Sequence, residues 1–323
     1  MRILEEHLRG LSNRVLEDRG LSDEDAGIVT DILVEAELRG RATHGMIRLP
    51  GIADRISVKP RQAMKLSRDG AAYALIDGQE NLGYLVAHRA ARTAIGRADR
   101  SGVGLVGAHN TSHCGMLGYY VSMIADAGMV GMAMCNTNPR IVPTGGAEPV
   151  LGTNPIAAAF PSASGQILVD LAAAAITNGE ILLAIKDGRS IPDGLAVGAD
   201  GRTTTDPEAA RTGGALPFGG HKGYALAVMI QMFTGVMMGG PPVPEPGQDY
   251  GLFVMAIDPQ IFLDKAEFDT AVVALVDRVK SSRRADGVAE ILIPGERAYR
   301  ERVLRQEEGL DIDDDVMAQI QQL

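Results

Sequence analysis

Apolar residues recur at helical spacing in the first part of the chain. Between residues 3 and 19 these positions are Ile3, Leu4, Leu8, Leu11 and Val15. Gly20 then predicts the end of this helix. Ser22 precedes three acidic residues and predicts the N-cap of a second helix. A third helix is predicted to begin at Thr43, because Pro50 is tolerated only near a first turn.

From about residue 70 the pattern alternates between short apolar runs and amphipathic stretches. Strands are predicted at 71–76, 103–106, 129–134, 156–160 and 167–171, with helices at 85–98 and 118–127. Residues 187–219 are rich in Gly, Asp, Thr and Pro and predict a long irregular surface segment. The remaining elements are predicted as an apolar helix from 219–223 to 236, a strand at 252–257, a helix at 266–281, a strand at 290–293 and a helical tail over 297–323. This alternation favours an α/β domain.

Composition narrows the class of protein. The chain has 323 residues, of which 46% are hydrophobic and 22% charged, as in soluble globular enzymes. A net charge of −10 argues against nucleic acid or an anionic membrane as a partner. No apolar run approaches the roughly 20 residues of a membrane span, and acids replace the apolar core of a signal peptide. With only Cys114 and Cys135 as cysteines, we expect a protein of the reducing cytoplasm.

The stretch 110–118 carries the strongest chemical signal. It holds an amide, two hydroxyls and the imidazole of His113 at the junction of a predicted strand and helix. His113 suits a general acid or base, because its ordinary pKa near ~6.5 permits proton exchange at physiological pH. The alternative is a capping or buried histidine satisfied by Asn110 or Ser112.

His44 and Arg48 form a second candidate pair. On one helix they would share a face, being four residues apart. A guanidinium binds a carboxylate in two places while an imidazole reaches the neighbouring oxygen, which suits a 2-oxo or 2-hydroxy acid. The alternative is a solvated helix start with two ordinary polar residues.

Four further patterns carry other interpretations. His109 and His113 are spaced for a metal, but Asn-Thr-Ser between them disfavours a helix. Cys114 could be a nucleophile, although a packed thiol fits better. The Gly pattern at 102–107 imitates a dinucleotide fingerprint but interrupts the strand instead of following it. Gly219-Gly-His-Lys-Gly223 before a helix is a better anion site.

Seven stretches, in this order, resemble the malate/L-lactate dehydrogenase family of NAD(P)-dependent oxidoreductases that lacks the Rossmann fingerprint. They are Thr-His-Gly-Met-Ile-Arg-Leu-Pro (43–50), Asn-Thr-Ser-His-Cys-Gly (110–115), Gly-Gly (145–146), Leu-Gly-Thr-Asn-Pro (151–155), Thr-Thr-Asp-Pro (204–207), Gly-Gly-His-Lys-Gly-Tyr (219–224) and Pro-Gly-Glu (294–296). The resemblance covers nearly the whole chain.

The resemblance implies an α/β (α+β) fold: a non-Rossmann cofactor domain (70–219) with a mixed, largely antiparallel sheet, packed against a helical substrate domain (1–69 plus 220–323). It also implies a homodimer, NAD or NADP as the cofactor, and a small anionic substrate. His44 and His113 become catalytic candidates, and Arg48 and Thr43 substrate-binding ones. Cofactor-binding candidates are Thr137, Asp170, Leu171, Ala172, Ala173, His221, Lys222, Gly295, Glu296 and Arg297; no metal is implied.

Two departures from the family pattern affect the expected activity. Ala173 and Ala174 stand where relatives carry hydroxyls, which could alter cofactor binding. The segment 239–251 is short and lacks an arginine that some relatives use for substrate. We therefore expect hydride transfer between nicotinamide and a small 2-oxo or 2-hydroxy acid, with reduction of a cyclic imine (Δ1-pyrroline-2-carboxylate or Δ1-piperideine-2-carboxylate) as the alternative. A metal-dependent hydrolase or lyase and a non-catalytic relative are the rival interpretations.

Overall fold

A computed structural model of the protein describes residues 2–59, 61–163, 165–245 and 248–323. Its centre is a seven-stranded sheet with the order β2-β3-β4-β10-β5-β6-β7. The strands are β2 Lys65–Asp69, β3 Tyr73–Asn81, β4 Val103–Thr111, β10 Tyr250–Ile257, β5 Val130–Cys135, β6 Ile156–Phe160 and β7 Ile167–Leu171. Only β3 and β4 pair in parallel among these neighbours. The predicted mixed, largely antiparallel sheet is therefore confirmed.

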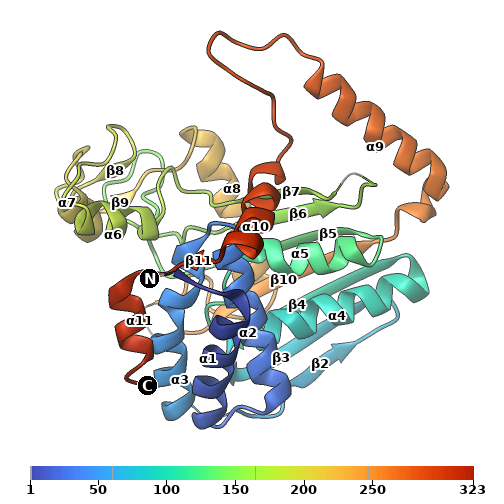
Figure 1. Ribbon diagram of the computed structural model, residues 1–323, viewed down its shortest axis with the longest axis horizontal. Helices are drawn as coiled ribbons and strands as arrows, with labels where there is room; N and C mark the ends of the chain where they lie inside the picture. The colour runs from blue at the N-terminus through green and yellow to red at the C-terminus, as the bar shows by residue number, and fades with distance from the viewer. Residues whose placement is uncertain (1, 60, 164, 246–247) are drawn as a thin grey trace.

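Helices from both ends of the chain form a layer beside this sheet (Figure 1). They are α1 Glu5–Asp18, α2 Asp23–Leu38, α3 Leu49–Val58, α10 Glu296–Glu308 and α11 Asp314–Ile320. The two ends are also joined directly, because β1 Arg2–Ile3 pairs with β11 Leu310–Asp311. The Ser22 hydroxyl caps α2 by accepting the Asp25 N–H at 3.2 Å, as the sequence predicted.

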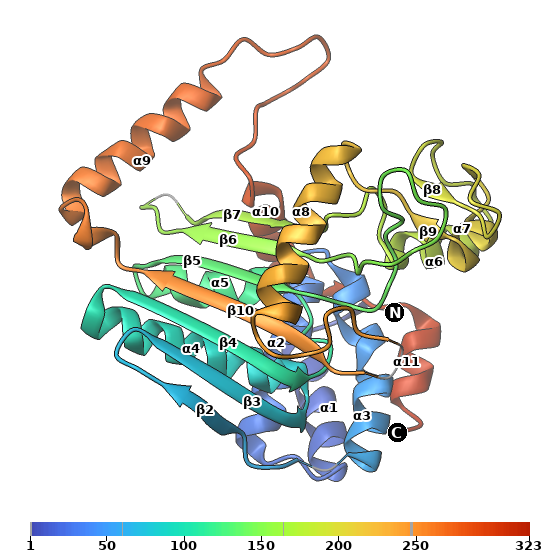
Figure 2. The same cartoon turned by 180° about the vertical axis from the view of Figure 1, so that it is seen from behind.

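Glycines within β4 allow layers to pack closely on both sides of the sheet. Helices α4 Gly83–Ser101 and α5 Leu117–Asp126 lie on the same side as the N-terminal helices, and α8 His221–Gln231 crosses the other side (Figure 2). A Cβ at Gly104 would overlap the Ala94 carbonyl of α4, and one at Gly107 would overlap the Met238 sulfur. The glycines at 104 and 107 are thus packing positions inside a strand.

The rest of the chain forms a small lobe and an arm. The lobe contains α6 Asn178–Lys186, β8 Ala196–Val197, α7 Pro207–Thr212 and β9 Gly214–Ala215, around its own apolar cluster. A π-helical turn, Met232–Val236, follows α8. The 3-10 turn Pro259–Ile261 leads into α9 Lys265–Lys280, which stands away from the body (Figure 1).

Two predictions about the fold need correction, and a third, the domain boundary, stays a prediction. Residues 290–293 form no strand beside β7, because Pro294 has no N–H and the Ile293 N–H is taken by Glu296. Residues 187–219 are not wholly irregular, since they contain β8, α7 and β9. The boundary at residue 220 would separate β10 from β4 and β5, to which it hydrogen bonds. We therefore propose a division in which residues 250–257 belong with the sheet.

Within residues 2–59, 61–163, 165–245 and 248–323, none of the helices combines the length and the apolar character that crossing a bilayer requires.

The close packing at Gly104 predicts a stability effect. Gly104→Ala should lower the free energy of unfolding by about 1–3 kcal/mol, because the added methyl overpacks the α4–β4 contact. Gly27→Ala in α2 is the matched control: nothing lies within 4 Å of the place its added methyl would take, so it should raise stability by about 0.5–1 kcal/mol. Urea unfolding would measure both. Equal midpoints for Gly104→Ala and the parent chain would contradict the packing role.

Candidate active site

His44 and Arg48 belong to a broken turn that follows α2. Residues Ala42–His44 and Met46–Arg48 form two separate 3-10 turns, and α3 begins directly afterwards. Gly45 between them has φ −94° and ψ −139°, outside the helical range. The prediction that His44 and Arg48 share one α-helical face is therefore wrong. The two side chains nevertheless line the same cavity.

This cavity, of about 580 Å³, brings together four predicted catalytic and substrate residues. Thr43, His44 and Arg48 come from the broken turn, and His113 comes from the loop between β4 and α5. The rings of His44 and His113 are stacked, with centroids 5.9 Å apart and planes 27° apart. Two histidines that lie far apart in the sequence are thus brought side by side in one cavity.

Hydrogen bonds orient both rings and the guanidinium. The Gly115 N–H donates to His113 Nδ1 at 3.2 Å, so a neutral His113 carries its proton on Nε2. The Tyr84 hydroxyl lies 3.4 Å from the same Nδ1. His44 Nδ1 and the Thr43 hydroxyl are 3.0 Å apart. Arg48 Nε donates to the Thr43 carbonyl at 2.7 Å, which holds the guanidinium against its own turn.

Burial and positive charge keep both imidazoles neutral. Burial lowers the pKa of His113 to about 3, with further lowering by Arg48 and His44. Burial likewise lowers the pKa of His44 to about 4, with Arg48 and Arg41 adding to the effect. A ring charge is disfavoured here both by lost hydration and by nearby cations. At neutral pH the free protein therefore holds two uncharged rings beside a charged Arg48.

Four of the predicted cofactor residues line the same cavity, namely Thr137, Asp170, Leu171 and Ala172. Asp170 accepts the Gly118 N–H at 2.9 Å, and burial raises the pKa of its carboxyl. The Thr137 hydroxyl accepts the Thr153 N–H at 3.0 Å. The far side of the cavity is formed by α6 of the small lobe.

The other predicted cofactor residues lie outside the cavity wall. Ala173 and the neighbouring Ala174 are buried in the apolar cluster of the small lobe, where hydroxyls would lie among apolar side chains. His221 and Lys222 are exposed at the start of α8. Gly295, Glu296 and Arg297 lie at the start of α10, where Gly295 approaches Leu168 and Glu296 pairs with Lys280. Their cofactor role stays a prediction.

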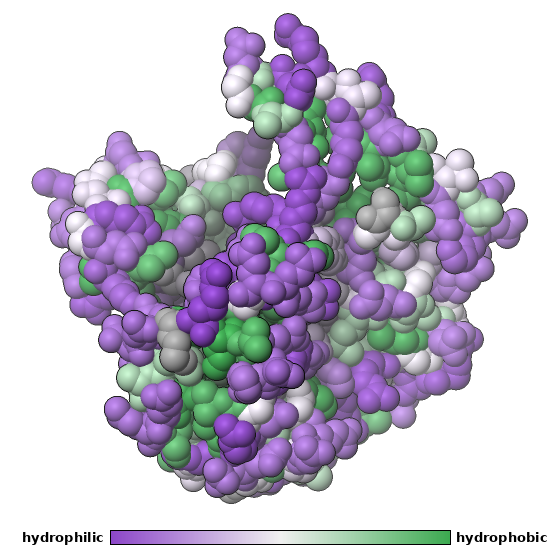
Figure 3. All heavy atoms as spheres, in the orientation of Figure 1, coloured by the Kyte–Doolittle hydropathy of each residue, from purple (hydrophilic) through white to green (hydrophobic). Residues whose placement is uncertain are grey.

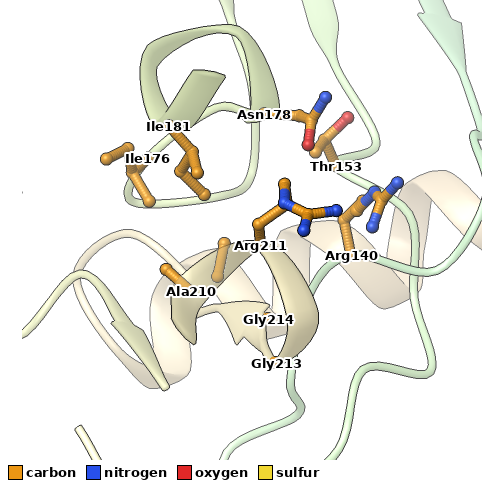
Figure 4. Close-up of a pocket in the computed structure, with 10 residues that line it drawn as sticks. Arg140, Thr153, Ile176, Asn178, Ile181, Ala210, Arg211, Gly213 and Gly214 are labelled. Atoms are coloured by element: carbon orange, nitrogen blue, oxygen red, sulfur yellow. The ribbon is translucent and has the colours of Figure 1, made fainter. Parts of the chain in front are cut away.

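Several residues that sequence analysis missed also line the cavity. Arg41, Asn138, Arg140 and Tyr250 are among them. Arg41 lies just before the stretch 43–50, but a single arginine in a sequence does not indicate a binding site. Tyr250 lies at the start of β10 and reaches the cavity because β10 pairs with β4 and β5, which lie far earlier in the sequence. A second cavity, of about 300 Å³, shares Arg48, His113, Asn138 and Tyr250 with the first. Arg140 also borders a small pocket with Arg211, Thr153 and Asn178 (Figure 4).

This geometry gives less support to the two alternatives, a metal site at His109 and His113 and a nucleophilic thiol at Cys114. Among the described residues, no group of three or more His, Cys, Asp or Glu side chains is placed to hold a metal ion. His109 lies within β4, opposite Asp77, whereas His113 lies beyond the end of that strand. Cys114 and Cys135 are buried free thiols whose sulfurs are 4.0 Å apart. Cys114 thus has the burial expected of a packed thiol.

Known proteins resemble the chain over its full length. The profile described as malate/L-lactate dehydrogenase matches residues 3–321. L-sulfolactate dehydrogenase of Methanothermobacter thermautotrophicus is 37% identical over 99% of this chain and 95% of its own. Malate dehydrogenase of Pyrococcus horikoshii is 36% identical over 100% and 94%. The solved sulfolactate dehydrogenase of Methanocaldococcus jannaschii has a TM-score of 0.92 and 38% identity, with 100% and 96% covered.

The lowered histidine pKa values predict acid sensitivity. A buried neutral histidine contributes stability that is lost as the pH falls from about 6.5, where the unfolded chain takes up its proton, toward the folded values near 3 and 4. Replacing His113 with Asn, which cannot become charged, should therefore reduce the loss of melting temperature between pH 6.5 and 4.5. Thermal unfolding across this window measures the difference. Parallel curves for the two proteins would contradict the buried neutral state.

Proposed function

This chain belongs to the malate/L-lactate dehydrogenase family, and we propose that it transfers a hydride between NAD or NADP and a small 2-hydroxy or 2-oxo acid. One observation carries the proposal: two stacked neutral imidazoles and the Arg48 guanidinium line a single cavity. Such a set matches the carboxylate and the adjacent oxygen of a 2-hydroxy acid. The substrates of the relatives, sulfolactate and malate, are acids of this class.

Arg48 is the proposed carboxylate ligand. Its Nε is bound to the Thr43 carbonyl, while its Nη groups have no hydrogen-bond partner among the described residues. A carboxylate bound there would offset the positive charge that lowers the pKa values of His44 and His113. Substrate binding would therefore remove the part of the lowering that is due to Arg48, while the larger part that is due to burial remains.

The two histidines have different capacities for proton transfer. His113 Nδ1 is occupied by the Gly115 N–H, so its Nε2–H can donate a hydrogen bond to the substrate oxygen. His44 contacts only a hydroxyl at Nδ1, and a Thr43 hydroxyl that accepts from it leaves His44 Nε2 as a free base. We therefore assign proton exchange with the substrate hydroxyl to His44 and orientation of that oxygen to His113.

The same cavity has room and polar groups for a nicotinamide cofactor, which when bound supplies or accepts the hydride. Asn138 Oδ1 is buried and lacks a hydrogen-bond partner within the described part of the chain, as expected of an atom that a polar ligand satisfies. The nicotinamide end of the cofactor would be held by Thr137, Asp170, Leu171 and Ala172. Gly223 packs against the carbonyl of Ala173, the residue that follows Ala172 in the cavity wall. His221 and Lys222 therefore lie just outside this wall, where they could bind the phosphates of the cofactor.

Kinetics of single variants would test these roles. His44→Ala should lower kcat by about 10²–10⁴-fold, because it removes the proton acceptor. Arg48→Ala should chiefly raise KM for the acid, since the carboxylate loses its bidentate partner. Nicotinamide absorbance would be followed with NAD and NADP across 2-hydroxy acids, 2-oxo acids with and without amines, and preformed cyclic imines.

His88→Ala is the control for these measurements, because His88 lines a separate cavity with Arg89 and Arg92. This variant should leave kcat and the KM for the acid unchanged. Normal turnover in His44→Ala would overturn the assignment of proton exchange to His44. Turnover of cyclic imines alone would identify the chain as an imine reductase, and failure to bind NADH or NADPH by fluorescence titration would reject the dehydrogenase proposal.

A homodimer is part of the same proposal. Helix α9 buries none of its residues within the described chain, although Val273, Leu275 and Val279 are apolar. A 16-residue helix that buries none of its residues is only marginally stable in water. Apolar side chains interrupt the hydrophilic surface where this arm extends (Figure 3). A second copy of the chain that packs against α9 would cover them, in agreement with the family resemblance.

The exposed apolar residues of α9 predict that the chain forms a dimer. Light scattering coupled to size exclusion should give a dimer for the parent chain. The double variant Val273→Asp with Leu275→Asp should shift it toward the monomer, because two charges would be desolvated in the interface. Glu267→Gln, at an exposed polar position of the same helix, should remain dimeric. A monomeric parent chain would contradict the proposal.

A further inference from the structure

Glu37 is a buried carboxylate at the end of α2, directly beneath the broken turn of residues 42–48. Its side chain is 3% exposed. Burial raises the pKa of its carboxyl to about 7, opposed by the Met46 N–H and by the positive charge of Arg305. Buried acids are rare unless a specific partner retains them. The partner here is the backbone that carries His44 and Arg48.

The Met46 N–H needs this partner because the turn is broken at Gly45. Within the turn, the Gly45 N–H reaches the Ala42 carbonyl at 3.1 Å and the Arg48 N–H reaches the Gly45 carbonyl at 2.9 Å. The Met46 N–H instead donates to Glu37 Oε1 at 2.7 Å. Without Glu37, a buried backbone donor would be left unsatisfied midway between His44 and Arg48.

The contact is close enough to dictate the residue at position 45. A Cβ on Gly45 would overlap Glu37 Oε1 and lie 2.7 Å from its Cγ. A side chain at position 45 would therefore displace the carboxylate or the turn. Glycine and glutamate form a matched pair, in which the missing side chain gives the carboxylate access to the backbone.

Glu37 is in turn held by α10. Arg305 of α10 donates to the Glu37 carbonyl oxygen at 2.8 Å, and its Nε is bound to Glu301 at 2.6 Å. Arg305 is the charged residue whose field acts on the Glu37 carboxyl. The end of the chain is thereby connected through Glu37 to the cavity that Arg48 and His44 line.

We propose that Glu37 is a positioning residue: its hydrogen bond to Met46 fixes the broken turn, and thereby sets His44 and Arg48 relative to His113. The kinetic part of this inference rests on the proposed function. Loss of the anchor would misplace two groups that act on the same substrate, and such displacements cost about 10²-fold in rate.

Glu35 provides a matched control on the same helix. It is also buried, at 7% exposure, and pairs with Arg39 at 2.7 Å and with Arg302 of α10 at 3.0 Å. Its carboxylate contacts neither 3-10 turn in any hydrogen bond of the described chain. Glu35→Gln should therefore weaken the contact between α2 and α10 without disturbing the turn.

Hydrogen exchange and kinetics on purified variants would test the inference together. In Glu37→Ala, the amide of Met46 in a peptide spanning 42–48 should lose protection, kcat/KM for the acid should fall about 10²-fold, and KM for the cofactor should stay within about twofold. Glu37→Gln keeps an acceptor oxygen, so it should retain most of the protection of the Met46 amide and most of kcat/KM for the acid. Glu35→Gln should lower the melting temperature while kcat, KM and the exchange of this peptide stay unchanged.

The outcomes separate the two proposals. Unchanged exchange at Met46 in Glu37→Ala would overturn the anchor, whatever the enzyme catalyses. Lost protection without a kinetic change would overturn the positioning role, as would equal kinetic losses in Glu37→Ala and Glu35→Gln. A parent chain without dehydrogenase activity would reject the proposed function, and the exchange experiment would still report on the anchor.

Discussion

The arrangement of the molecule depends on α2, a helix that is buried along most of its length. It contacts α1, α4, α5, α10 and both 3-10 turns, and Ile32 and Leu33 are fully buried. A helix enclosed in this way must satisfy its polar side chains internally, as the 2.8 Å bond between Thr30 and Ser12 illustrates. Because contacts fix the position of α2 on several sides, they also fix where the turn after its C-terminal end lies, beside the ends of β5 and β7.

That turn meets the loop after β4 because close packing brings the two together. Gly104 lets α4 lie against β4, and Gly83 at the start of α4 lies so near the 112–113 backbone that a Cβ would overlap the Ser112 carbonyl. The Ser112 hydroxyl accepts the Gly83 N–H at 2.9 Å. Small residues at these contacts therefore control where His113 lies, and a rigid scaffold presents it to His44.

The charge distribution supports this chemistry in an acidic chain. The formal charge is −10, yet Arg41, Arg48 and Arg140 line the main cavity. The charge of Arg41 adds to the burial that lowers the pKa of His44, and it partly offsets the burial that raises the pKa of Asp170. A local positive field within a negative surface attracts small anions while it disfavours larger polyanions. Together with burial, which has the larger effect, this field lowers the pKa values of His44 and His113 and keeps both rings uncharged.

Local signals in the sequence determined much of this protein. The strands at 156–160 and 167–171 and the Ser22 cap were predicted with their observed bounds, because their signals lie within a few residues. His44, Arg48 and His113 were likewise selected as candidates from the sequence, and they line one cavity, while their chemical roles stay predictions. Tertiary structure alone decided their meeting, the central place of β10, the cavity role of Tyr250 and the hydrogen bond of Glu37 to Met46. These features depend on contacts between distant segments, which periodicity and local propensity do not encode.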